Sequence, residues 1–279
     1  MADYKNIKGF NIQYLDSDPP NPIEGQMWFN STSQTLKGAE VGGAPVGTWA
    51  SGGDLNTGRE SANGGGTSQS LVTVAGGYNG TAIVTNTESY NGSSWTELND
   101  LNAATSIAGG AGTSTAALNI AGESATTPAG LKVATVESWD GTNWTEVNDV
   151  SSVRRQVNSF GTQTAAISAS GLFPAPAGSY QNIVEFYNGT NWTEIAEINT
   201  ARYGGASSGT SGSAGLISGG DNGGSPSMTG QTEIWNGTAW TEVADLNTSR
   251  FMAAGSGSST SALTSGGRND PTSVFYANT

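Results

Sequence analysis

The chain has 279 residues, contains 41 Gly but no Cys and no His, and carries a net charge of −13 because 23 acidic residues outnumber 10 basic ones. The lack of Cys and His excludes disulfides, zinc sites built from these residues, a Cys nucleophile and a His general base. The acidic balance disfavours binding to a nucleic-acid backbone, and no apolar run is long enough to span a bilayer. We expect no cofactor, no metal, no nucleic-acid partner and no membrane insertion.

Residues 1–40 show no repeat pattern. The opening MADYKNIKGFNIQYLDSD lacks the apolar core of a signal peptide, so we expect the protein to be made in the cytoplasm and not exported. The Pro-rich stretch 19–22 is predicted to be extended. The segment GQMWFNSTSQTLK (25–37) is predicted to form two short strands around a polar turn.

The phrase NPIEGQMWFNSTSQTLKG (21–38) resembles the opening of tail-fibre and other virion proteins of tailed phages, especially marine ones. The resemblance implies that residues 1–40 are an extended attachment segment that binds other virion proteins. Within it we expect an anchor formed by Pro22, Trp28, Phe29 and Leu36. The alternative is an N-terminal hairpin packed on the rest of the chain.

From residue 41 onwards the sequence repeats. The tryptophans Trp49, Trp95, Trp144, Trp192 and Trp240 are 46, 49, 48 and 48 residues apart. A period near 48 in a Gly-rich, strand-rich sequence predicts a β-propeller with one four-stranded blade per repeat. Four of the tryptophans lie in near-identical phrases: YNGSSWTEL (90–98), WDGTNWTEV (139–147), YNGTNWTEI (187–195) and WNGTAWTEV (235–243).

Each repeat is predicted to contain four strands. In the fourth repeat we expect the innermost strand at 201–209, the third around 231–235 and the outer strand at 239–246, with an Asn-Gly turn at 236–237. The second strands are expected at 71–77, 117–123, 165–171, 213–220 and 261–267.

The two ends of the repeat region predict how the ring closes. The last repeat stops without a Trp phrase, and the phrase VGTWASGGDL (46–55) has no repeat of its own. We therefore expect 46–55 to supply the outer strand of the last blade, which leaves no unpaired sheet edge. The predicted fold is all-β, with an attachment segment at 1–40 and a five-bladed propeller at 41–279.

The repeats also resemble the Kelch repeat, and the resemblance covers residues 46–279. It implies the blade geometry but no particular Kelch partner. The matching residues are the diglycines Gly76-Gly77, Gly219-Gly220 and Gly266-Gly267, the aromatic pairs Tyr90/Trp95 and Tyr187/Trp192, and the arginines Arg59, Arg202 and Arg250. The departures are Gly122-Glu123, Ser170-Gly171 and Thr105, which replaces the Arg of the second repeat.

Acidic residues recur in two registers of the repeat. Because a catalytic carboxylate pair needs two specially placed acids, we interpret these equivalent residues as solvent-facing cross-strand partners and expect no enzymatic activity. The alternative is a carbohydrate-active site that pairs Glu60, which lies outside the pattern, with Asp221 or Glu123. The recurring acids are Glu88, Glu137, Glu185 and Glu233 in one register, and Glu97, Glu146, Glu194 and Glu242 in the other.

Four arginines, Arg59, Arg154, Arg202 and Arg250, are predicted to lie around one mouth of the central channel, where guanidinium groups can hold an anion. The alternative, which we favour, is that each bonds carbonyl groups of its own or a neighbouring blade.

On the same face, the long loops between second and third strands vary most between repeats. The candidate contact residues there are Tyr78, Phe173, Tyr180 and Asp221, for a sugar or a protein surface, unless they pack under their own loops.

These observations favour a non-enzymatic structural protein of a phage particle. We expect a propeller displayed on the virion, as part of a fibre or appendage or as a capsid decoration, for adhesion or protein contact. Its partners are expected to be other virion proteins, a host surface glycan or protein, and further copies of itself. The alternatives are a carbohydrate-active enzyme or lectin-like propeller, and a cellular Kelch-like scaffold.

Overall fold

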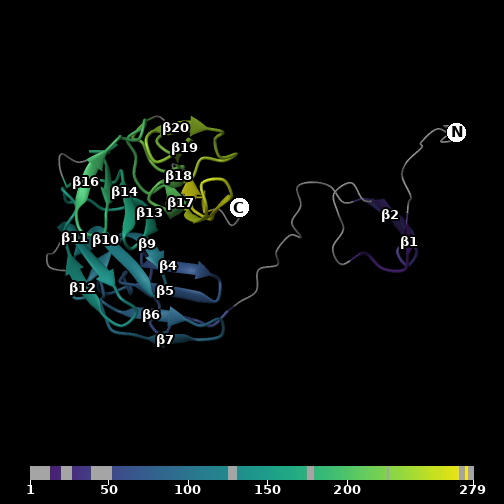
Figure 1. Cartoon of the computed structure of the whole chain (residues 1–279), viewed down its shortest axis with the longest axis horizontal. Helices are drawn as coiled ribbons and strands as arrows, with labels where there is room; N and C mark the ends of the chain where they lie inside the picture. The colour runs from purple at the N-terminus through teal and green to yellow at the C-terminus, as the bar shows by residue number, and fades with distance from the viewer. Residues whose placement is uncertain are drawn as a thin grey trace. The chain divides into compact units, whose positions relative to one another are not determined.

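The computed structural model describes residues 13–19, 27–38, 52–124, 131–174, 179–224, 226–269 and 274–275 (Figure 1). The chain divides into two compact units, Met1–Ser51 and Gly52–Thr279. Throughout the described ranges the regular structure is β-strand, so none of them holds a helix able to cross a membrane.

The first unit contains a three-stranded sheet. Strand β1 (Gln13–Leu15) pairs in parallel with β2 (Met27–Asn30), which pairs antiparallel with β3 (Thr35–Gly38). The Asn30 side chain closes the turn after β2, because its Oδ1 accepts the N–H groups of Thr32 and Ser33. The two predicted strands and their polar turn are confirmed, whereas β1 was not foreseen.

Gly52–Thr279 contains four sheets of four or more antiparallel strands, which Figure 1 shows side by side around a common centre. The first sheet is β4 (Asn63–Ser68), β5 (Leu71–Ala75), β6 (Thr87–Tyr90) and β7 (Trp95–Glu97). The second is β8 (Thr105–Ser106), β9 (Gly109–Thr113), β10 (Ala116–Ser124), β11 (Leu131–Trp139) and β12 (Trp144–Val147).

The next two repeats each form one four-stranded sheet. The third sheet is β13 (Asn158–Thr162), β14 (Ala165–Ala169), β15 (Val184–Tyr187) and β16 (Trp192–Ile195). The fourth is β17 (Ala206–Ser211), β18 (Ala214–Ser218), β19 (Thr232–Trp235) and β20 (Trp240–Val243). In the last repeat β21 (Ala254–Gly257) pairs with β22 (Ala262–Ser265), and β23 (Arg268–Asn269) pairs with β24 (Val274–Phe275).

The fold is therefore all-β and propeller-like, and the predicted second strands coincide with β5, β10, β14, β18 and β22. The innermost strand of the fourth repeat begins at Ala206, later than the expected 201. Residues just before it instead form a connection that passes through Gly204, whose φ is +64°. A strand cannot include such a left-handed residue without breaking its ladder.

This left-handed residue recurs once in every repeat and links the repeats together. Ile107 donates its N–H to the Ser61 carbonyl, Gln156 to Ile107, Gly204 to Gln156 and Met252 to Gly204, over 2.8–3.1 Å. All five residues have φ between 54° and 64°. Positive φ is unfavourable for residues other than Gly, so the recurrence indicates that this chain of hydrogen bonds determines the connection.

In each of the first four repeats, the aromatic residues of the repeat phrase pack against each other across the two outer strands. Tyr187 lies opposite Trp192 in the strand register with ring centroids 4.9 Å apart, and Trp235 lies opposite Trp240 at 5.4 Å. The Trp240 indole also donates to the Ala196 carbonyl of the preceding repeat. The recurring aromatic pairs therefore build the sheets, as expected, and Trp240 also joins its sheet to the preceding repeat.

Candidate functional site on the loop face

Three of the four arginines expected around the channel mouth pair with buried carboxylates, which argues against the anion site that was the less favoured expectation for them. Arg59 pairs with Glu88 and Arg154 with Glu185, each at 2.5 Å, and Arg202 pairs with Glu233. The side chains of these six residues are at most 1% exposed, so the guanidinium groups face carboxylates and not the channel. Burial lowers the pKa of Arg154 and of Arg202, and the nearby carboxylate opposes this shift in each case.

The favoured alternative is confirmed, because each arginine also bonds carbonyl groups. Arg59 donates to the Val74 carbonyl, Arg154 to Ser168, Arg202 to Gln231 and Arg250 to Gly266. The glutamate partners were missed, and the prediction that they face solvent is wrong for one register, whose members Glu88, Glu137, Glu185 and Glu233 are at most 3% exposed. The recurrence of Arg about 30 residues before Glu was the available signal, but spacing alone does not show which strand face is buried.

Among the described residues, the central channel is lined by no charged side chain. A cavity of about 1020 Å³ is lined by the innermost strands β4, β9, β13, β17 and β21. Its walls in the described part of the chain consist of Gly, Ala, Ser and other uncharged residues. A pair of catalytic carboxylates inside the channel is therefore not formed by these residues.

Non-repeating residues gather instead on the face that carries the long loops. In each repeat, the residue just before the left-handed one pairs with a residue at the end of the second strand or just beyond it. These pairs extend each sheet toward the loop face, and their residue types differ completely from repeat to repeat. The pairs are Glu60 with Tyr78, Ser106 with Glu123, Arg155 with Leu172, Tyr203 with Asp221, and Phe251 with Arg268.

An aromatic cluster crosses the third, fourth and fifth repeats on this face. The Tyr180 and Tyr203 rings are 5.4 Å apart, Phe251 lies 5.1 Å from Tyr203, and the Arg268 guanidinium sits 5.3 Å from the Phe251 ring. The Tyr203 hydroxyl donates to Asp221 over 3.3 Å. Burial, and then the negative charge of Asp221, raise the pKa of Tyr203 to about 12.

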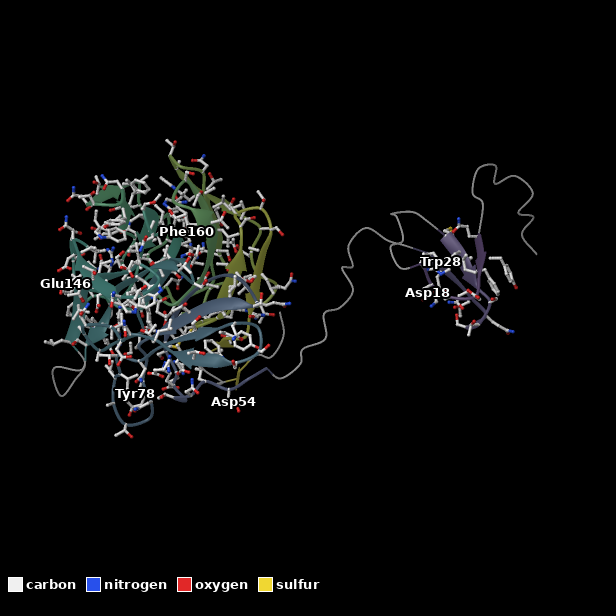
Figure 2. All side chains as sticks on the ribbon, turned by 60° about the horizontal axis from the view of Figure 1, so that its bottom comes forward. Asp18, Trp28, Asp54, Tyr78, Glu146 and Phe160 are labelled. Atoms are coloured by element: carbon white, nitrogen blue, oxygen red, sulfur yellow. The ribbon has the colours of Figure 1, made fainter. Side chains whose placement is uncertain are left out.

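Only two of the four predicted loop residues therefore lie in this aromatic cluster. Tyr180 and Asp221 share this cluster, where Asp221 is 7% exposed and also accepts the Gly223 N–H. Tyr78 belongs to the first repeat and lies on an outlying loop (Figure 2), with its hydroxyl bonded to the Gly80 carbonyl. Phe173 is half-buried, and its N–H donates to Ser179.

A second cavity lies between the first and second repeats. It has a volume of about 280 Å³ and is lined by Glu60, Ser61, Tyr78, Ile83, Ser106, Ile107 and Glu123. The structure therefore brings Glu60 and Glu123 to one pocket, as one of the two suggested pairings requires, and places Asp221 in the aromatic cluster instead. Glu123 also forms an ion pair with Arg155 of the third repeat.

The proposed anchor residues lie on two faces of the N-terminal sheet. Trp28 is 5% exposed, and its indole donates to Asp18, which also accepts from Asn30 and Lys37 (Figure 2). These bonds, that of Lys37 foremost, lower the pKa of Asp18 to about 2. Phe29 and Leu36 are cross-strand neighbours on the opposite face, together with Tyr14. Pro22 lies outside the described residues.

No protein-family model and no curated protein matches the sequence. Among solved structures, that of YjhT is similar to this chain. The superposition covers 79% of this chain and 80% of YjhT, with a TM-score of 0.65 and 13% sequence identity. At this identity the likeness concerns the fold alone, and it agrees with a propeller-like arrangement of antiparallel sheets.

Proposed function

We propose that the protein is a non-enzymatic display protein of a tailed-phage particle, made in the host cytoplasm, and that its loop face provides adhesion. One observation carries the adhesive role. The repeated residues serve the fold, as in the buried Arg202–Glu233 pair, whereas the residues that differ between repeats gather on the loop face. A rigid scaffold with variable loops on one face is a common design for binding.

We further propose five blades, closed by an outer strand that the segment 46–55 supplies. The Trp192 indole donates to Asn148, just after β12, and the Trp240 indole donates to Ala196, just after β16. The Trp95 indole donates in the same way to Gly53, over 3.0 Å. Gly53 therefore occupies the position that follows an outer strand, which supports an outer strand directly before it.

The attachment role is assigned to residues 1–40 and the propeller to 41–279. In support, Met1–Ser51 forms a compact unit of its own, and its sheet exposes an apolar stripe. Tyr14 is 75% exposed and Leu36 is 54% exposed, with Phe29 between them in the register. Exposed apolar stripes of this kind are typical of contact surfaces. The proposed partners are other virion proteins and further copies of the chain.

Mass spectrometry of density-purified particles tests the attachment. The chain is expected at a constant ratio to the major capsid protein, and a variant that lacks residues 1–40 is expected to be lost from the particles. Adsorption assays test the loop face, because an excess of purified full-length protein is expected to slow phage adsorption to the host. Finding the chain only in the soluble lysate would contradict the proposal.

Glycoside hydrolysis is a second candidate, favoured by the joint presence of Glu60 and Glu123 in the 280 Å³ pocket. The ion pair between Glu123 and Arg155 opposes it, since one carboxylate is already engaged. Release of reducing ends from host surface polysaccharide, abolished by Glu60→Gln, would establish hydrolysis and overturn the non-enzymatic proposal.

A further inference from the structure

The pocket between the first and second repeats exists because of one small residue. Ser106 occupies the position that Arg155, Tyr203 and Phe251 occupy in the next three repeats, each directly before the left-handed residue. Each of these large side chains contacts the preceding repeat: Arg155 pairs with Glu123, Tyr203 packs on Tyr180, and Phe251 packs on Tyr203. At the corresponding junction Ser106 leaves a cavity of about 280 Å³.

The walls of this pocket are held in place by the fold. On one side, Glu60 and Tyr78 exchange two backbone hydrogen bonds of 2.8 and 2.9 Å, and Tyr78 also pairs with Ile83. On the other side, Glu123 pairs with Ser106 in the ladder between β8 and β10. The 2.9 Å bond from the Ile107 N–H to the Ser61 carbonyl joins the two sides. The site is therefore preformed, as small-molecule sites usually are.

Its chemistry combines three kinds of group. Tyr78 supplies an aromatic ring with its hydroxyl fixed, and Ile83 and Ile107 supply aliphatic surface. Glu60 and Glu123 supply carboxylate acceptors. A sugar ring presents complementary groups, since its hydroxyls donate to carboxylates and its C–H face packs on aromatic and aliphatic side chains.

We propose that this pocket binds one neutral sugar ring of a host surface glycan, an assignment that rests on the adhesive function proposed above. A volume of about 280 Å³ admits a single ring and not an extended chain. The charge of Glu123 is balanced by Arg155, while Glu60 is exposed and the pocket has no cation of its own among the described lining residues. The Glu60 carboxylate therefore repels anionic sugars.

Titration of the full-length protein with methyl glycosides of glucose, galactose, mannose and N-acetylglucosamine, followed by saturation-transfer NMR, tests the assignment. For one sugar ring we expect a dissociation constant of about 1–10 mM for at least one of them. Methyl glucuronide, which has the glucose ring with a carboxylate, is expected to bind at least tenfold more weakly than the neutral sugar.

The decisive variant is Ser106→Tyr, which places in the second repeat the side chain that the fourth carries as Tyr203. It is expected to abolish sugar binding while the melting temperature stays close to that of the wild type. Ser93→Tyr, the same change at an exposed position between β6 and β7 and outside the pocket lining, is the matched control and is expected to bind as the wild type does. Should Ser106→Tyr unfold, Glu60→Gln and Tyr78→Ala are each expected to weaken binding at least tenfold without filling the pocket.

Three results would overturn the assignment. The first is the absence of saturation transfer to any neutral sugar at 50 mM, well above the expected range of about 1–10 mM. The second is unchanged binding in the folded Ser106→Tyr variant, or in both Glu60→Gln and Tyr78→Ala. The third is binding of glucosamine without binding of neutral sugars, which would indicate a cation site. None of these results bears on whether the chain is found in purified particles, so the failure of this assignment is distinct from the failure of the virion role.

Discussion

The second and fourth repeats place the same buried carboxylate in two different environments. In the fourth repeat, Glu233 accepts hydrogen bonds from the Asn199 backbone and side chain and pairs with Arg202. In the second, Glu137 accepts the equivalent bonds from Asn102, both at 2.8 Å, but forms no ion pair among the described residues. The carboxylate therefore recurs because it fixes the loop that joins two sheets, and the arginine is an addition to that role.

In the second repeat, two neutral side chains fill the space that the arginine occupies in the fourth repeat. Thr105 stands in its place, and its hydroxyl accepts a 2.9 Å hydrogen bond from Asn119. Asn119 lies opposite Glu137 in the strand register, the position that Ser168 and Ile217 hold in the third and fourth repeats. A neutral hydrogen-bonded pair thus replaces the guanidinium. The Glu137 carboxylate itself stays buried and is held by its two hydrogen bonds from Asn102.

Removing one partner of the intact pair is expected to have the largest effect. Arg202→Ala leaves the Glu233 carboxylate buried without its counter-charge, so we expect a loss of about 3–5 kcal/mol in the free energy of unfolding. Urea denaturation measures this loss. The matched change in the second repeat, Thr105→Ala, removes one neutral hydrogen bond and is expected to cost about 1 kcal/mol. Equal losses in the two variants would contradict the contrast between the repeats.

Introducing the arginine into the second repeat is expected to have a smaller effect. Thr105→Arg alone is expected to destabilise, because Asn119 already contacts this position and bonds Thr105. The double variant Thr105→Arg/Asn119→Ser copies the third repeat, and we expect its free energy of unfolding to lie within about 1 kcal/mol of the wild type. A double variant no better than the single one would show that the two repeats differ elsewhere as well.

The loop face is expected to lose stability at alkaline pH. The pKa of Tyr203 is raised to about 12 from its ordinary value of 10.0, so between these values the folded state holds a proton that the unfolded state has released. The free energy of unfolding therefore falls as the pH rises from about 10 to 12. Tyr203→Phe is expected to flatten this part of the profile, as measured by melting temperatures. An unchanged slope in the variant would assign the loss to other groups.

The N-terminal sheet is expected to lose stability at acid pH. The Asp18 pKa is lowered to about 2 from 3.8, so the stability that Asp18 provides is present above pH 3.8 and is lost as the pH falls toward 2. The indole N–H resonance of Trp28, whose donor bond ends on Asp18, reports this change. The Asp18→Asn variant keeps an acceptor for Trp28 but loses the charge opposite Lys37. In this variant the Trp28 indole resonance is expected to be insensitive to pH between 3.8 and about 2.

The repeats in the sequence made the order of the strands predictable, whereas the residues of the candidate site could be predicted only in part. The recurring Trp phrases and Asn-Gly turns fix strand order, because they act locally and identically in each repeat. The Arg202–Glu233 pair was missed because spacing does not reveal which strand face is buried. The pocket beside Ser106 was not foreseen because it results from the absence of bulk at a position where other repeats carry Arg155, Tyr203 or Phe251. Glu60 and Glu123 had been singled out, as acids outside the repeat pattern.

The most direct test of the proposed role is cryo-electron microscopy of purified particles. We predict five-bladed density on the capsid or tail, with the N-terminal sheet against neighbouring virion proteins and the loop face, with Tyr78 and Tyr203, directed away from the particle. Density with the loop face buried against the particle would contradict adhesion through that face. The absence of the chain from intact particles would contradict the virion role itself.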